Sequence, residues 1–144
     1  MSEHFRKLER MYNTAAKINE YFRPRLTISG EGRAEVEIEI RPDFFHAANA
    51  VHGAVYFKAL DDAAFFAVNS LVPDVFVLTV SYNVYLTRPI SEGIMKATAR
   101  VVHQSRQLFV AEAELHDGRG KQIGRGSGSF MRSTIALTPE IGYV

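Results

Sequence analysis

Two adjacent carboxylates stand in an apolar, alanine-rich stretch at positions 53–70 of this chain. The stretch has no internal Gly or Pro and is apolar on nearly every side, which predicts a buried helix. At 100° per residue, Asp62 shares the only polar stripe with Lys58, and the i,i+4 spacing favours an ordinary ion pair. Asp61 falls on the apolar face without such a partner. Because isolated burial of a carboxylate is costly, Asp61 is the candidate for a reactive group.

The entrance of this helix is the second candidate feature. Asn49 is a candidate N-cap, while Gly53 leaves first-turn N–H groups open to a carbonyl oxygen or a developing oxyanion. Glycine at a helix start more often reflects tight packing alone. His52 at the same place is more often a packed, hydrogen-bonded histidine than a ligand, although a role beside the site stays open.

Several other kinds of chemistry are excluded by composition. The 144 residues include no cysteine, which removes thiolate metal sites and cysteine nucleophiles. The five histidines lack metal-ligand spacing, so neither a metal nor a cofactor is expected. The formal net charge of +1 does not indicate a nucleic-acid-binding protein. Glycines 124, 126 and 128 match no phosphate motif and instead predict close approach of a backbone or helix.

The elements that must position Asp61 follow from periodicity. An amphipathic helix is predicted over 3–22 and an alternating strand over 33–41, before the buried helix. Four further strands, linked by short turns, are expected to form an antiparallel meander: 75–87, 94–103, 108–116 and 121–132. This order predicts an α+β domain over 1–144, with one antiparallel sheet curved around the central helix. The other face of that sheet would need cover, so self-association is expected.

Three segments together resemble a known family. The run from His52 to Phe65, followed by Asn69-Ser70 and by Tyr85–Pro89, is similar to the hotdog-fold thioesterases of the phenylacetate-degradation type. The resemblance covers residues 34–132. In that family the catalytic Asp lies nine residues after the His that opens the central helix, which selects Asp61 here. The resemblance implies a hotdog fold with an extra N-terminal helix, and hydrolysis of an acyl- or aryl-acyl-CoA to free acid and CoA.

The resemblance also implies roles for individual residues. Gly53 N–H would polarise the thioester carbonyl, and Asp61 from the other subunit of a dimer would act as nucleophile or general base. A hydroxyl on the following strand that bonds this Asp maps to Thr79. Coenzyme A enters only as part of the substrate. The assembly would be a homodimer or a homotetramer.

The chain departs from the family pattern at two positions. Ala54 replaces a second glycine, and His46 stands where Asn is frequent, so either His46 or Asn49 would orient the water. Candidate substrate-binding residues are aromatic for the acyl group and basic for the CoA phosphates: Phe57, Phe65 and Tyr85, with Arg88 and Arg106.

Two other functions stay open. A non-catalytic acyl-CoA binding module would bind the thioester without turnover, and a hotdog-fold dehydratase or hydratase would pair a catalytic His with an acid. The first residues interleave charged and apolar side chains, unlike a signal peptide. The most apolar stretch is interrupted by polar residues, so no membrane span is expected and a cytoplasmic location is the expectation.

Overall fold

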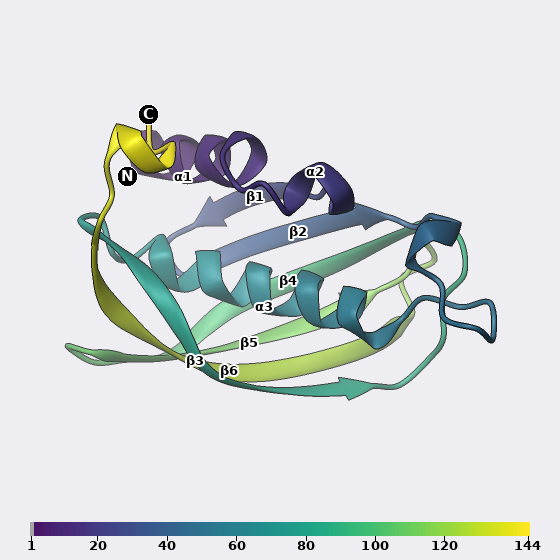
Figure 1. Ribbon diagram of the computed structural model, residues 1–144. Helices are drawn as coiled ribbons and strands as arrows, with labels where there is room; N and C mark the ends of the chain where they lie inside the picture. The colour runs from purple at the N-terminus through teal and green to yellow at the C-terminus, as the bar shows by residue number, and fades with distance from the viewer. Residues whose placement is uncertain (1) are drawn as a thin grey trace.

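The computed structural model describes residues 2–144. The helices are α1 (Ser2–Thr14), α2 (Asn19–Phe22) and α3 (Gly53–Asn69), with 3-10 turns η1 (Pro42–Phe44) and η2 (Pro139–Ile141). The strands are β1 (Arg25–Gly30), β2 (Arg33–Glu39), β3 (Val75–Leu86), β4 (Ile94–Gln104), β5 (Leu108–His116) and β6 (Gln122–Ala136). Figure 1 shows the sheet curving around α3, with α1 and α2 beside β1 and β2. This is the hotdog architecture that the sequence predicts.

The strand order differs from the predicted meander. The sheet runs β1-β2-β4-β5-β6-β3, so β4, β5 and β6 form a meander but β3 pairs with β6 and not with β4. The prediction of a hairpin between β3 and β4 is therefore wrong. Their connection passes the start of α3, where the Val51 N–H donates to Ile90 O at 3.0 Å. The Tyr56 hydroxyl also donates to Arg88 O in this connection, at 2.6 Å.

The N-terminal helix is shorter than predicted. The prediction of one helix over 3–22 is wrong, because α1 ends at Thr14 and α2 begins only at Asn19. The buried Asn19 side chain donates to Tyr12 O at 2.8 Å and so satisfies a carbonyl in the last turn of α1. The break lets the chain turn back over the sheet.

Strand β1 is absent from the sequence-based prediction. It pairs with β2 and alternates between exposed side chains and the buried Leu26 and Ile28. Its alternation has a length typical of a strand, so this element was predictable from the sequence. Within residues 2–144, no helix is long and apolar enough to pass through a bilayer.

The inner face of the sheet is built from small residues where α3 crosses it. They are Ala97, Ala99, Ala111, Ala113, Gly126 and Gly128. A Cβ atom at Gly126 or Gly128 would lie 2.3 Å from the ring of Tyr82. The close approach predicted from the glycine pattern is thus confirmed, although the approaching group includes a tyrosine ring as well as the Ser81 carbonyl.

The outer face of the sheet is polar where it was expected to need cover. Ion pairs cross it between Lys96 and Glu35 at 3.3 Å and between Arg100 and Glu112 at 3.2 Å. Exposed large apolar side chains are more numerous on the edge strand β3, at Leu78, Val80, Tyr85 and Leu86, than on β4, β5 or β6. Such a long apolar edge is a surface to which another strand can pair.

Candidate active site

The Asp61 carboxylate lies on α3, facing β3. Its Oδ1 accepts a hydrogen bond from Thr79 Oγ1 at 2.9 Å. Burial raises the pKa of Asp61 to about 6, opposed by the Thr79 hydrogen bond; nearby Asp62 raises it further and Lys58 lowers it. A carboxyl group with this pKa is ionised at neutral pH and is still basic enough to accept a proton.

A bulge in β3 brings Thr79 to this position. Thr79 pairs with Phe130 and Ser81 with Ser129, so Val80 is an extra residue in β3. Strict alternation would place Thr79 and Tyr82 on opposite faces, but both contact α3. Thr79 bonds Asp61, and the Tyr82 hydroxyl donates to Leu60 O at 3.2 Å.

Asp62 has a different set of partners. Lys58 Nζ lies 2.7 Å from Asp62 Oδ2, which confirms the predicted ion pair. The Tyr12 hydroxyl donates to the same oxygen at 2.6 Å, so the pair also connects α1 to α3. With two donors on one oxygen, Asp62 has a structural explanation that Asp61 lacks.

The start of α3 is capped by His52 and not by Asn49. His52 Nδ1 accepts the Ala54 N–H at 2.9 Å. Asn49 lies in the preceding turn with a φ of 65°, and its N–H donates to His46 O at 3.0 Å, so the prediction of an Asn49 cap is wrong. The Gly53 N–H has no hydrogen-bond acceptor among residues 2–144. It is therefore free for a carbonyl oxygen.

Gly53 and Asp61 cannot act on one carbonyl within a single chain. The two residues are eight positions apart on α3, and at 1.5 Å per residue they are separated by about 12 Å along the helix. The two candidate groups therefore lie at separate places in each chain. One is the open N–H at the helix start, and the other is the carboxylate in the middle of the helix.

Three of the predicted residues meet at the helix start. His46, Gly53 and Arg88 line a shallow pocket of about 310 Å³. His46 is exposed, and its Nδ1 accepts the Ala48 N–H at 3.1 Å. Asn49 does not line this pocket.

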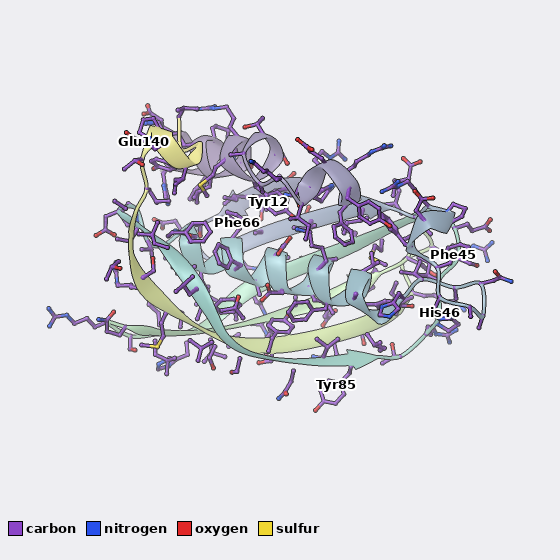
Figure 2. The ribbon with its side chains drawn as sticks, in the orientation of Figure 1. Tyr12, Phe45, His46, Phe66, Tyr85 and Glu140 are labelled. Atoms are coloured by element: carbon purple, nitrogen blue, oxygen red, sulfur yellow. The ribbon has the colours of Figure 1, made fainter. Side chains whose placement is uncertain are left out.

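Three other predicted residues lie elsewhere. Arg106 is exposed in the β4–β5 turn, and the strand register puts it at the opposite end of the sheet from Arg88. Figure 2 shows Tyr85 outside β3, pointing away from α3. Phe57 is 42% exposed and packs edge-to-face on Tyr82, with ring centroids 5.8 Å apart.

A larger pocket of about 560 Å³ opens beside Asp61. Asp61 and Thr79 lie in its wall, and most of the remaining lining is apolar. Of the predicted acyl-binding residues, Phe65 lines this pocket, whereas Phe57 and Tyr85 do not. The apolar lining from α1, β3 and the C-terminal segment was not predicted from the sequence; it includes Met11, Tyr12, Phe76 and Ile141. Among residues 2–144, no three His, Asp or Glu side chains gather into a metal site.

The part of the chain that contains α3 matches a known family. Residues 48–123 match the model of the Thioesterase superfamily, a span that is more than half of the chain and includes all of α3. This chain belongs to the Thioesterase superfamily. A "Putative esterase" of Saccharolobus solfataricus is 22% identical over 130 residues, which are 90% of this chain and 93% of the relative. A "Putative esterase" of Mycobacterium tuberculosis is 27% identical over 106 residues, covering 71% of this chain and 76% of the relative.

Solved structures of other proteins share the architecture of this chain. The Escherichia coli PaaI protein from the phenylacetic acid degradation operon superposes with a TM-score of 0.85 at 21% identity, covering 95% of this chain and 98% of that one. A conserved Pseudomonas aeruginosa protein gives a TM-score of 0.78 at 23% identity, covering 85% and 98%. These likenesses establish the hotdog fold, and superfamily membership supports thioester hydrolysis in general.

Proposed function

We propose that this protein is an acyl-CoA thioesterase that converts an acyl- or aryl-acyl-CoA and water into the free acid and CoA. The observation that carries the proposal is the Asp61 carboxylate, which is bonded to Thr79 and placed in the wall of an apolar pocket. In the reaction the carbon–sulfur bond breaks, a carbon–oxygen bond forms, and a proton passes to the CoA sulfur. Asp61 either takes the proton from the attacking water or attacks the carbonyl carbon itself.

We place the complete site between two copies of the chain. The Gly53 N–H of one copy and Asp61 of the other would act on one carbonyl, because one helix separates them by about 12 Å. The exposed apolar edge of β3 supports this assembly, since pairing with a second β3 would cover Leu78 and Val80. The N–H at the helix start would stabilise the oxyanion with help from the helix dipole.

The pocket around Gly53 supports two further assignments. Because His46 lines this pocket and Asn49 does not, His46 is the better candidate for orienting the water or the carbonyl. Arg88, in the same pocket, is the better candidate for a CoA phosphate than the distant Arg106. Coenzyme A is a part of the substrate in this proposal, and the reaction uses no other cofactor.

A hydratase is the less favoured enzyme. That chemistry pairs a catalytic histidine with the acid, and within one chain no histidine lines the pocket that holds Asp61. Of the histidines that a second copy would bring there, His46 already accepts the Ala48 N–H through Nδ1. His52 Nδ1 is already the acceptor for the Ala54 N–H.

The direct test is thiol release from a panel of acyl-CoAs. The proposal expects turnover of at least one apolar acyl-CoA. Tight binding of acyl-CoAs without any thiol release would overturn it and favour a non-catalytic binding module.

The hydrogen bond from Thr79 to Asp61 leads to a prediction for the pH dependence of kcat/KM. The ionised form of Asp61 is the reactive one, so kcat/KM should rise with pH and level off above about pH 6. Thr79→Val removes a hydrogen bond that lowers the Asp61 pKa, so the acid limb should move to higher pH. The loss of kcat/KM should thus be larger at pH 6 than at pH 8. Thr79→Ser, which keeps the hydroxyl, is the control, and a loss equal at both pH values would contradict the role.

A further inference from the structure

We infer that the pocket beside Asp61 receives the acyl group of the substrate, that α1 and the C-terminal segment set its size, and that it accepts an apolar acyl group bulkier than one benzene ring. This inference rests on the proposed function and names the substrate class for that site. It assigns α1 and the C-terminal segment a role in substrate choice.

The first support is the position of the reactive atom. Asp61 Oδ1 accepts from Thr79, whereas Oδ2 accepts no hydrogen bond among residues 2–144 and remains available. The other charged side chains of the lining, Lys58 and Asp62, are occupied with each other. The pocket therefore presents one free carboxylate oxygen within largely apolar walls. An acyl group seated there would have its carbonyl carbon next to Asp61.

The second support is the aromatic wall. The ring centroid of Phe65 lies 5.0 Å from the ring centroids of Phe66 and of Phe76. The ring centroids of Tyr12 and Phe66 are also 5.0 Å apart. Figure 2 shows Phe66 on α3 and Tyr12 on α1, on the side of the molecule where the two helices face each other. Such a wall favours apolar substituents through burial and edge contacts.

The third support is size. The pocket volume of about 560 Å³ exceeds the roughly 150 Å³ of a cavity that holds benzene. A single ring or an acetyl group would leave most of this volume unfilled. A medium-chain or extended aryl acyl group fills it better.

The wall formed by α1 is fixed in place, so it can limit the length of the acyl group that fits the pocket. The buried His4 bonds Asn69 O at 2.9 Å through Nε2 and the Tyr143 hydroxyl at 2.7 Å through Nδ1. These contacts hold α1, the end of α3 and the C-terminal segment together. Ala15 packs closely on Gly142, where a Cβ would lie 2.4 Å from the Ala15 Cβ.

The test uses a substitution at Ala16 that narrows the pocket. This residue is half-buried in the lining and lies between α1 and α2, outside regular helix. Ala16→Phe should lower kcat/KM for decanoyl-CoA at least about tenfold while leaving acetyl-CoA within about twofold. Lys17→Phe places the same ring one residue further on, outside the pocket lining, and should leave kcat/KM unchanged for both substrates. Ile141→Ala widens the pocket and should shift preference toward longer acyl groups.

A binding measurement separates this inference from the proposed function. Asp61→Asn protein, which lacks the negative charge at the carboxylate, is titrated with decanoate and with acetate by calorimetry. Decanoate binding that Ala16→Phe abolishes would support the pocket even if no acyl-CoA were hydrolysed. The contrary outcome is thioester hydrolysis with the same acyl preference in Ala16→Phe, in Ile141→Ala and in the unmodified protein. If both variants also kept the melting temperature, this result would overturn the inference and leave the proposed function standing.

Discussion

Asp61→Asn is expected to lower kcat/KM for thioester hydrolysis by about 10³-fold, in the middle of the range for loss of a general base. The amide cannot accept the proton of the attacking water, and it cannot form a covalent intermediate. Its carbonyl oxygen can still accept the Thr79 hydrogen bond, so the geometry around position 61 is kept. Thiol release with saturating and limiting acyl-CoA measures the effect.

The same substitution should stabilise the folded protein at pH 7.5. The pKa of Asp61 is raised from 3.8 to about 6, chiefly by burial, so between these values the folded state binds more protons than the unfolded state. Stability therefore falls as pH rises from about 4 to about 6, and the full penalty applies above that range. Asn removes the buried charge and should add about 1–3 kcal/mol to the free energy of unfolding at pH 7.5. The gain should disappear near pH 4 in urea denaturation.

Asp62→Asn is the matched control, because the two carboxylates are adjacent. Asp62 holds Lys58 and Tyr12, so its loss should lower stability and cost far less turnover. Equal losses of turnover in the two variants would contradict the distinction between these residues. So would a loss of stability in Asp61→Asn at pH 7.5.

Gly128→Ala is expected to destabilise the fold by about 3 kcal/mol, at the upper end for overpacking a core. The added Cβ would lie 2.3 Å from Tyr82 Cδ2 and 2.8 Å from Ser81 O. Rotation of the ring cannot relieve the second contact, because that oxygen belongs to the backbone of the paired strand β3. Urea denaturation measures the loss.

Gly118→Ala provides the comparison for this prediction. Gly118 lies in the β5–β6 turn, and a Cβ there would meet nothing within 4 Å. This substitution should leave the free energy of unfolding nearly unchanged. If Gly118→Ala and Gly128→Ala had the same effect, close packing of Tyr82 on β6 would not be the reason for the glycine.

Local features of the central helix were predictable from the sequence. The apolar periodicity of 53–70 and the i,i+4 spacing of Lys58 and Asp62 depend only on residues within one helix, and both are confirmed. The spacing of glycines along β6 likewise indicated close packing. It did not reveal that a Tyr82 ring fills the space, since that residue comes from another strand.

Features that depend on distant contacts were not predictable in the same way. The pairing of β3 with β6 joins segments far apart in the chain, and short turns alone suggested a meander. The bulge at Val80, which turns Thr79 toward Asp61, has no distinct signal in an apolar alternating run. The pocket beside Asp61 needs α1 and the C-terminal segment, whose meeting no local pattern encodes.

The shared site is best tested by combining two inactive chains. Gly53→Pro removes the open N–H at a position where proline is well tolerated, the first residue of a helix. His52 already has the extended backbone that precedes proline, with φ −63° and ψ 144°. Gly53→Ala keeps the N–H and is the control; its Cβ would meet only the exposed Leu86 side chain, at 3.0 Å.

Gly53→Pro and Asp61→Asn should each have very low activity alone. After subunit exchange in an equimolar mixture, a dimer with one chain of each kind would have one complete site out of two. Random pairing makes half of the dimers mixed, so activity should return to about a quarter of that of the unmodified protein. Recovery of thiol release on mixing is the result expected if Gly53 of one copy acts with Asp61 of the other. An exchanged mixture that stays as inactive as its two components would contradict it.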